Sequence, residues 1–212
     1  MGATGQRLDV SRAVAADLAS IMAAERMDGY DQLVGRWSEE YHRSAMHDRR
    51  HAYFIVRLDG KPKGFAIVRD WNSPGRVCSV KRIAVTEPGC GYGRVLLSET
   101  LRAIFEETSG YRVWLGVFPD NDRARRAYEA VGFQREGLAR GNAFFGGLHR
   151  DELIMSILRP DWLRIRRYLS ASSALQLNHL VPPLCWPSFR RTDHLRQAGS
   201  SCLCIRWAVA AR

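Results

Sequence analysis

Residues 85–94 read Val-Thr-Glu-Pro-Gly-Cys-Gly-Tyr-Gly-Arg and join a strand-like apolar run to an amphipathic one. Glycines at 89, 91 and 93 let the backbone turn tightly and bring several N–H groups toward one point. A helix is expected from about Arg94, and its positive end adds to those donors, which favours a pyrophosphate site. A plain turn also fits, whereas the Gly-Lys-Ser/Thr of a P-loop and the further glycine of a Rossmann loop are missing.

A second motif lies at residues 121–133, which read Asn-Asp-Arg-Ala-Arg-Arg-Ala-Tyr-Glu-Ala-Val-Gly-Phe. Ala124 and Tyr128 are four residues apart, so they share one face of the expected helix, where the small residue leaves space for a ligand beside the phenol. Gly132 is typical of a helix C-cap, and Phe133 begins the next strand. The order is therefore strand, glycine loop, helix, strand, helix with tyrosine, and strand.

The rest of the chain extends this alternation in both directions. Period-2 runs bounded by turn residues predict strands, and apolar residues at helical spacing predict helices, the first of them capped by Ser11. Strands are expected at 8–10, 52–58, 63–70, 78–85, 112–118, 133–143 and 148–158, and helices at 13–27, 33–46, from about 94, and at 122–131. This order predicts a mixed α/β (α+β) sheet flanked by helices in a single domain.

Charge divides the chain in two. Residues 1–162 carry a balance of +3, whereas residues 163–212 hold eight Arg and a single acid, a balance of +7. We therefore predict a domain at 1–162 and a basic, irregular extension at 163–212. The extension is open to three interpretations: a disordered segment, an appendage packed on the domain, or non-native sequence read in a shifted frame. Because the domain is nearly balanced, nucleic-acid binding by it is only weakly supported.

The composition also bounds location and metal chemistry. No apolar run approaches the roughly 18 residues of a membrane-spanning helix, and residues 1–10 lack a secretory pattern, so a cytoplasmic protein is expected. The cysteines are odd in number and show no metal-ligand spacing with histidines, which predicts reduced thiols and no metal site. They are Cys78, Cys90, Cys185, Cys202 and Cys204.

Together, the glycine loop and the 121–133 block resemble the GNAT superfamily of N-acetyltransferases, over about residues 8–158. The resemblance implies a mostly antiparallel sheet and acetyl-CoA as co-substrate. The strand before the loop would pair with the pantetheine arm, the loop amides would hold the pyrophosphate, and Asn121 would hydrogen-bond the arm. The implied cofactor-binding residues are Ile83, Ala84, Val85, Gly89, Cys90, Gly91, Tyr92, Gly93, Arg94, Asn121, Ala124 and Tyr128. The loop departs from the family pattern at Pro88, where Gln or Arg is usual.

The chemistry implied by the resemblance is direct attack of a primary amine on the thioester within a ternary complex. Tyr128 is the expected general acid, because a phenol with a reference pKa of ~10 can protonate the departing thiolate. Cys90 is interpreted as a tolerated loop residue rather than a nucleophile, since no His is near it in sequence. Arg123, Arg125 and Arg126 suit the 3′-phosphate of CoA.

The sequence does not identify the general base or the acceptor amine. The strand residues 79–82 read Ser-Val-Lys-Arg and offer no carboxylate as base. The acidic and imidazole side chains Glu25, Glu39, Glu40 and His42 are interpreted as solvated helix residues, and a water relay is an equal alternative. The aromatic residues Trp37, Tyr41 and Trp71 could line a pocket for an amine-bearing small molecule or peptide.

Two other functional classes remain: a non-catalytic acyl-CoA-binding regulatory module, and an RNA-directed acetyltransferase. A homodimer is compatible with the sequence, and no membrane partner is expected.

Overall fold

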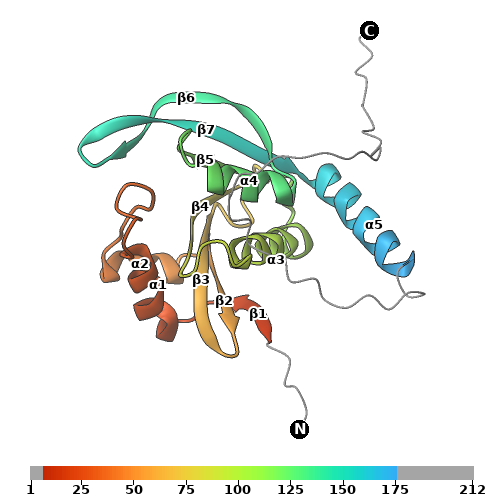
Figure 1. The fold of residues 1–212 in the computed structure, drawn as a ribbon, viewed down its shortest axis with the longest axis horizontal. Helices are drawn as coiled ribbons and strands as arrows, with labels where there is room; N and C mark the ends of the chain where they lie inside the picture. The colour runs from red at the N-terminus through yellow and green to blue at the C-terminus, as the bar shows by residue number, and fades with distance from the viewer. Residues whose placement is uncertain (1–6, 176–212) are drawn as a thin grey trace, which may run out of the picture. The chain divides into compact units, whose positions relative to one another are not determined.

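The computed structural model describes residues 7–175, with one continuous sheet at its centre (Figure 1). The strand order is β1-β2-β3-β4-β5-β7-β6, and within the described chain all neighbours are antiparallel except β4 and β5. The elements are β1 (Leu8–Arg12), η1 (Ala15–Asp17), α1 (Leu18–Glu25), α2 (Glu39–His47), β2 (His51–Leu58), β3 (Lys61–Arg69), β4 (Val77–Val85), α3 (Tyr92–Glu107), β5 (Arg112–Val117), α4 (Asp122–Val131), β6 (Gln134–Phe145), β7 (Leu148–Leu158) and α5 (Arg159–Leu175). The expected mixed, mostly antiparallel sheet flanked by helices is confirmed.

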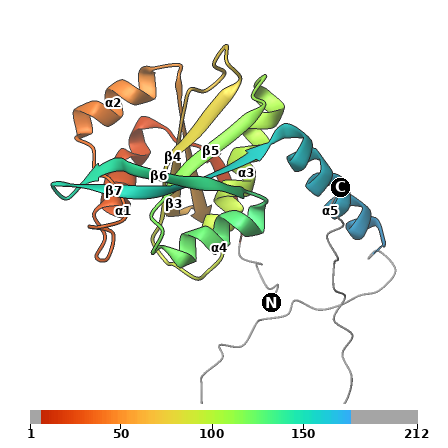
Figure 2. The same ribbon diagram turned by 90° about the horizontal axis from the view of Figure 1, so that it is seen from above.

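Helices cover both faces of the sheet, with α1 and α2 on one side and α3 and α4 on the other (Figure 2). Successive residues of a strand point to opposite faces, so a central strand serves two cores. Phe54 of β2 belongs to the core under α3, whereas its neighbour Tyr53 belongs to the core under α1 and α2. Phe65 of β3 is 1% exposed in the second core, where truncation to Ala costs about 3–5 kcal/mol.

The two parallel strands separate soon after they meet. β4 and β5 pair only through Val77–Ser79 and Arg112–Trp114. Beyond Ser79, β4 stays paired with β3 as far as Val85. In the described sheet, the edge of residues 83–85 that faces β5 therefore has no strand partner. This opening between β4 and β5 is the place where an extended ligand can add to the sheet through its own amide groups.

The structure differs from the sequence predictions mainly at the acceptor-side helices. The first helix is divided into η1 and α1, and Ser11 lies in β1 and is not a cap. The second helix begins at Glu39 and not at residue 33, because the Ser38 side chain accepts a hydrogen bond from the Tyr41 N–H and caps it. Residues 26–38 form a loop instead, which we call the acceptor-side loop.

Helical structure continues past residue 162, where the domain was expected to end. α5 runs to Leu175, and Trp162 is buried against Phe105 with ring centroids 5.1 Å apart. Trp162 and Ile165 therefore attach the start of α5 to the core under α3, so the helix extends into a segment that was expected to be irregular. The domain boundary itself stays a prediction, and residues 176–212 lie outside the described part of the chain.

The structure bears on the expectations for thiols, membrane-spanning helices and metal sites only over residues 7–175. Cys78 is a buried free thiol and Cys90 an exposed one, while the other three cysteines lie outside the described residues. Across residues 7–175, no helix combines the length and apolarity needed to cross a bilayer, and no cluster of potential metal ligands is found.

Candidate functional site

The glycine loop is built as the sequence predicts, with one shift. Gly89 has φ +96° and Gly91 has φ +82°, a left-handed region that side chains rarely adopt. Gly91 is the N-cap of α3, so the helix begins at Tyr92, two residues before the expected start. The Gly91 carbonyl accepts the Arg94 N–H at 3.1 Å, whereas the N–H groups of Tyr92 and Gly93 have no acceptor within the described chain and can bind an anion.

A cation that the sequence pattern did not single out lies beside this loop. The Lys63 carbonyl on β3 accepts the Thr86 N–H at 2.9 Å, which ties the end of β4 to the start of β3. The Lys63 ammonium pairs with Glu87 and lies 6.0 Å from the centre of the Tyr92 ring. The hydrogen bond with Glu87 raises the pKa of Lys63, so this side chain is charged at neutral pH.

Helix α4 has the predicted bounds and presents the two predicted polar groups. The Asn121 Oδ1 accepts the Ala124 N–H at 3.1 Å, which makes Asn121 the N-cap. Its Nδ2 has no hydrogen-bond partner among residues 7–175 and stays available to a ligand carbonyl. Gly132 caps the other end at φ +107°, and the half-buried Tyr128 ring packs against Phe133 at 6.2 Å.

The Tyr128 phenol lies in an environment that keeps it protonated. Burial raises its pKa well above the ordinary tyrosine value, and the nearby phenol of Tyr30 raises it further. Tyr30 itself donates a 2.7 Å hydrogen bond to the Val85 carbonyl oxygen at the end of β4. The Tyr128 phenol therefore lies near Tyr30 and the unpaired segment 83–85, where a proton donor can act on a bound thioester.

Several polar side-chain atoms on α4 have no partner within the described chain, and their chemistry suits CoA. The Arg125 Nε is buried with no hydrogen-bond partner in the described chain, although Arg125 also pairs with Asp122. Arg123 and Arg126 are exposed and have no ion pair within residues 7–175. Together with the free Asn121 amide and the left-handed glycines, these donors fit a ligand that carries amides and phosphates.

The acceptor-side loop spans the opening between β4 and β5 on the α1 and α2 face. It is attached to β4 through Tyr30 and to the β6–β7 hairpin through Gln32, whose carbonyl accepts from Arg150 Nη1 at 2.8 Å. Arg150 also lies 3.8 Å over the Phe118 ring, just after β5. The loop, the hairpin and the diverging strands therefore enclose one end of the opening.

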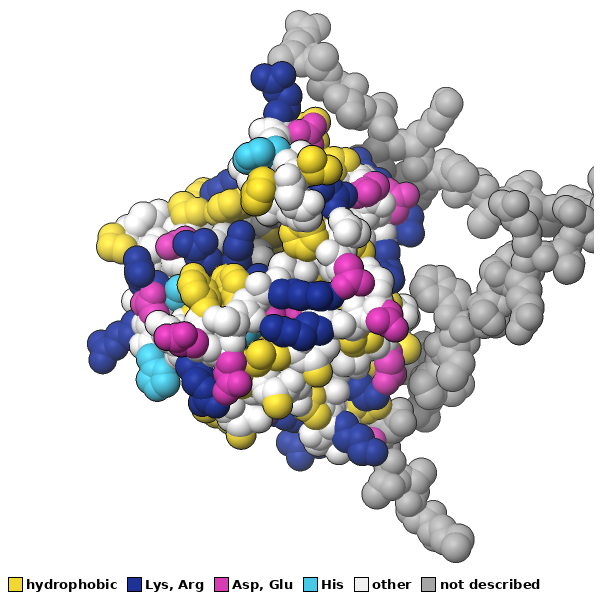
Figure 3. All heavy atoms as spheres, turned by 90° about the vertical axis from the view of Figure 1, so that its left-hand side faces the viewer, with side chains coloured by type: hydrophobic (Ala, Val, Ile, Leu, Met, Phe, Trp, Pro, Cys, Tyr) yellow, Lys and Arg dark blue, Asp and Glu magenta, His cyan; other side chains and the backbone are white. Residues whose placement is uncertain are grey.

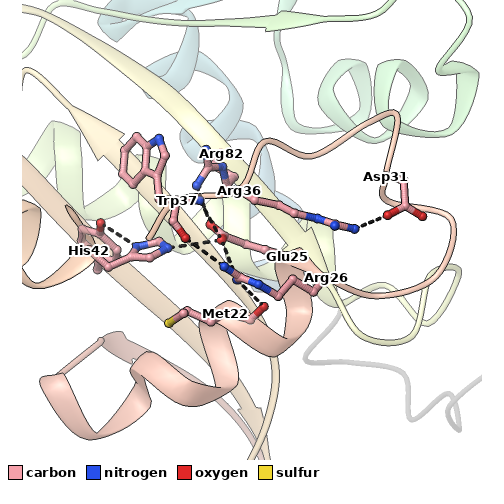
Figure 4. A network of polar contacts seen from close by, with 9 residues as sticks. Met22, Glu25, Arg26, Asp31, Arg36, Trp37, His42 and Arg82 are labelled. Atoms are coloured by element: carbon pink, nitrogen blue, oxygen red, sulfur yellow. Dashed lines mark hydrogen bonds and ion pairs between the residues drawn. The ribbon is translucent and has the colours of Figure 1, made fainter. Parts of the chain in front are cut away.

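A buried polar network holds the other end of this loop (Figure 4). Glu25 of α1 is 0% exposed, and its Oε2 lies 3.2 Å from the His42 Nε2 of α2. The Glu25 Oε1 pairs with Arg82 of β4, and Oε2 also accepts a hydrogen bond from the Trp37 N–H at 3.4 Å. The Arg82 guanidinium is stacked 4.3 Å from the centre of the Trp37 ring. Sequence reasoning placed Glu25 and His42 in solvent, and that prediction is wrong.

The protonation pattern of this network follows from its hydrogen bonds. Burial disfavours the ionised Glu25 carboxylate, but the hydrogen bond with His42 and the charge of Arg82 outweigh it, so the pKa of Glu25 is lowered. A His42 tautomer with its proton on Nε2 donates to Glu25 and leaves Nδ1 to accept from the Tyr53 hydroxyl at 3.1 Å. An ionised, fully paired Glu25 is a poor general base.

A second carboxylate lies on β7 at the rim of the opening. A Cβ added to Gly116 of β5 would lie 2.8–2.9 Å from the Glu152 carboxylate atoms, so the absence of a side chain there makes room for Glu152. Its Oε2 accepts from Asn142 Nδ2 at 2.6 Å, and within residues 7–175 it has no ion-pair partner. Ser79 pairs with Trp114, so Gly116 is about level with residues 81–82, at the start of the unpaired segment.

The remaining residues predicted for the acceptor side lie on opposite faces of the sheet. The Trp37 and Tyr41 rings lie against each other at a tilt of 56° with centroids 4.4 Å apart, and Glu39 is exposed and paired with Arg43. Trp71 instead lies with Phe54 in the core under α3, so its predicted place in an acceptor pocket is wrong. On the face that carries α1, α2 and the hairpin tip, acidic and basic side chains are interspersed (Figure 3), so single side chains rather than a one-sign patch would select the acceptor.

Comparison with known proteins agrees with this arrangement. The model of the Acetyltransferase (GNAT) family matches residues 18–133, which covers α1, the glycine loop and all of α4. The chain belongs to the GNAT acetyltransferase family. By this membership it is an acyltransferase, as the resemblance of the two motifs implied.

Individual GNAT relatives differ in how much of their length they share with the chain. It is 34% identical to a putative ribosomal N-acetyltransferase of Bacillus subtilis, over 66% of this chain and 85% of the relative. It is 26% identical to the spermidine N(1)-acetyltransferase of Vibrio cholerae, over 69% of this chain and 83% of the relative. A probable N-acetyltransferase of Bacillus subtilis is 34% identical, but the chain spans only 40% of its length.

Solved structures show the same GNAT fold. The spermidine N-acetyltransferase of Vibrio cholerae in complex with CoA and spermine superposes with a TM-score of 0.66 at 22% identity, over 74% of this chain and 98% of that one. The same enzyme in complex with manganese ions gives a TM-score of 0.63 at 23% identity, over 75% of this chain and 96% of that one. At this identity the likeness concerns the fold alone.

Proposed function

We propose that the chain transfers an acetyl group from acetyl-CoA to a primary amine within a ternary complex, with Tyr128 as the general acid. The observation that carries this is the meeting of three groups at one end of β4: the unpaired edge of residues 83–85, the glycine loop, and the protonated phenol of Tyr128. Acetyl-CoA supplies the thioester carbonyl that the amine attacks.

The cofactor half of the site uses backbone and side-chain donors. The edge of Ile83, Ala84 and Val85 pairs with the pantetheine amides, since β5 has already diverged there. The amides from Gly89 to Arg94 and the positive end of α3 hold the pyrophosphate. Asn121 Nδ2 donates to the arm, and Arg123 and Arg126 lie on the helix that faces the nucleotide end.

The chemical step needs one proton donor and one place for the amine. As the C–N bond forms and the C–S bond breaks, the sulfur gains negative charge, and Tyr128 donates its proton there. A phenol with a raised pKa keeps this proton until negative charge develops on the sulfur. The Glu152 carboxylate, which has no ion-pair partner within the described chain, binds the amine as it arrives as an ammonium. The ammonium gives up one proton to water before it attacks, the nitrogen gives up a second one as the amide forms, and water returns a proton to Tyr128. Holding both reactants side by side contributes much of the rate.

The relatives are likewise named as N-acetyltransferases. Spermidine is the substrate named for the Vibrio cholerae enzyme, and a ribosomal target is named for a Bacillus subtilis relative. We therefore propose a cationic amine as acceptor, which suits a carboxylate at the rim of the opening.

Calorimetry of acetyl-CoA with the full chain, followed by an assay of thiol release with a panel of amines, tests the proposal. The panel contains spermidine, lysine, an aminoglycoside and peptides with free α-amino groups. One-to-one binding with thiol release on addition of an amine is expected. Absence of acetyl-CoA binding defeats the proposal. Binding without thiol release from any amine favours the non-catalytic module, and steeply salt-dependent RNA binding favours the RNA-directed alternative.

A further inference from the structure

The network around Glu25 buries charged side chains, and removing charges from water costs free energy. Glu25 and His42 are 0% exposed and Arg82 is 8% exposed. Buried ion pairs lose as much in desolvation as they gain in attraction, and well-packed apolar replacements are often neutral or stabilising. A contribution to stability is therefore a weak reason for this network.

The contacts of this network link several helices and strands. Glu25 ends α1, His42 belongs to α2, Tyr53 to β2 and Arg82 to β4. Arg82 immediately precedes residues 83–85, the edge left open beside β5. The network therefore joins the strand proposed to bind the thioester to both helices on the acceptor side.

The same groups also orient the backbone of the acceptor-side loop. The Trp37 N–H donates to Glu25 at 3.4 Å, and the Trp37 carbonyl accepts from Arg26 Nη2 at 3.0 Å. A Cβ added to Gly35 would lie 2.9 Å from Arg82 Nη2, so the loop backbone lies directly on the guanidinium. Directional hydrogen bonds of this kind fix a peptide group in a way that apolar packing does not.

We propose that Glu25 is a positioning residue for the acceptor: through Arg82, His42 and the Trp37 peptide it holds the acceptor-side loop in register with β4, and so sets where the amine meets the thioester. The inference rests on the proposed function. Glu25 does not touch substrate, since its side chain is completely enclosed. Its effect is on the geometry of the loop that carries Tyr30, Gln32 and Trp37.

Two substitutions of matched kind test this role. Glu25→Gln keeps the shape but removes the charge that holds Arg82. Asp17→Asn is the control, because Asp17 pairs with Arg57 at 2.6 Å and ties the start of α1 to β2, away from the acceptor-side loop. In both variants we measure the unfolding midpoint, the acetyl-CoA dissociation constant, and kcat and KM for the best amine of the panel.

Both variants are expected to unfold at a lower temperature. Glu25→Gln is expected to lower kcat/KM for the amine at least tenfold while the acetyl-CoA dissociation constant stays within twofold. Asp17→Asn is expected to keep kcat/KM within twofold. Equal kinetic losses in the two variants, or an unchanged kcat/KM in Glu25→Gln, would overturn the inference.

A combined apolar replacement separates positioning from stability. Glu25→Met, His42→Leu, Tyr53→Phe and Arg82→Met together remove the buried ion pair and its side-chain partners, and leave only the Trp37 N–H and the exposed Arg26 side chain without Glu25 as acceptor. Recovered stability without recovered kcat/KM supports positioning, and recovery of both overturns it; if this variant does not fold, the first pair decides. A wild-type chain that binds no acetyl-CoA overturns the proposed function and this inference together. A wild-type chain that acetylates amines beside an unimpaired Glu25→Gln overturns this inference alone.

Discussion

The Tyr30 hydroxyl donates a 2.7 Å hydrogen bond to the carbonyl oxygen of Val85, which lies 55 positions further along the chain. Tyr30 is buried and Val85 is partly buried, so removal of the Tyr30 hydroxyl leaves a partly buried carbonyl with one partner fewer. Tyr30→Phe is expected to lower the free energy of unfolding by about 0.5–1.5 kcal/mol in urea titrations. Tyr111→Phe, at a side chain 48% exposed, is the control and should change it little. Equal effects in the two variants would show that the bond to Val85 contributes nothing.

The Tyr128→Phe substitution tests the proposed role of Tyr128 as the general acid. Because the phenol is proposed to protonate the departing thiolate, kcat should fall by about 10²-fold or more, the usual contribution of a general acid. The acetyl-CoA dissociation constant from calorimetry should stay within a few fold, since the ring itself is retained. Tyr168→Phe, at a tyrosine 76% exposed, should leave both unchanged. A wild-type kcat in Tyr128→Phe would remove the residue from the mechanism.

Glu152→Gln tests the amine site. Loss of a charge pair with the ammonium should raise the amine KM about tenfold, equivalent to roughly 1.4 kcal/mol, and leave acetyl-CoA binding unchanged. Gly116→Ala should have the same effect, because the added Cβ would come within 2.8 Å of the carboxylate and displace it. Glu107→Gln, at an exposed pair with Arg12, is the matched control. If the KM stays at the wild-type value in both site variants, Glu152 does not bind the acceptor.

Glu136 predicts a dependence of stability on pH. Its hydrogen bonds with Arg112 and Ser156 lower the pKa of Glu136 to about 2, below the value of ~4.3 for an unfolded glutamate. A carboxyl group with a depressed pKa stabilises the fold above the unfolded pKa, and this contribution is lost as the pH falls from about 4.3 toward 2. The effect is modest because the side chain is 38% exposed. In urea titrations across this range, Glu136→Gln should weaken the pH dependence, and parallel wild-type and variant curves would contradict the assignment.

Much of the cofactor half could be predicted from sequence because its signals are local. A left-handed glycine, an Asn cap and a tyrosine one turn beyond Ala124 are properties of short segments, and α4 has the bounds that its sequence pattern predicts. The start of α3 was missed by two residues because Gly91, and not a later residue, forms its cap. The expected roles of these residues in binding acetyl-CoA stay predictions.

The acceptor half could not be predicted because its groups come from distant parts of the chain. Glu25 and Arg82 are 57 positions apart, and nothing in either local pattern indicates that they pair. Glu152 needs the empty space over Gly116, which exists only once β5 and β7 lie side by side.

By itself, the sequence from residue 85 to residue 133 determined the order of elements, the glycine loop and the tyrosine helix, because backbone conformation there depends on neighbouring residues. Only the tertiary structure decided which carboxylates are enclosed and which are free. Burial and pairing are set by contacts between α1, α2, β4 and β7, and these contacts convert Glu25, assigned to solvent from its helical pattern, into the centre of an ionic network. The divergence of β4 from β5 likewise depends on sheet register, which no single segment encodes.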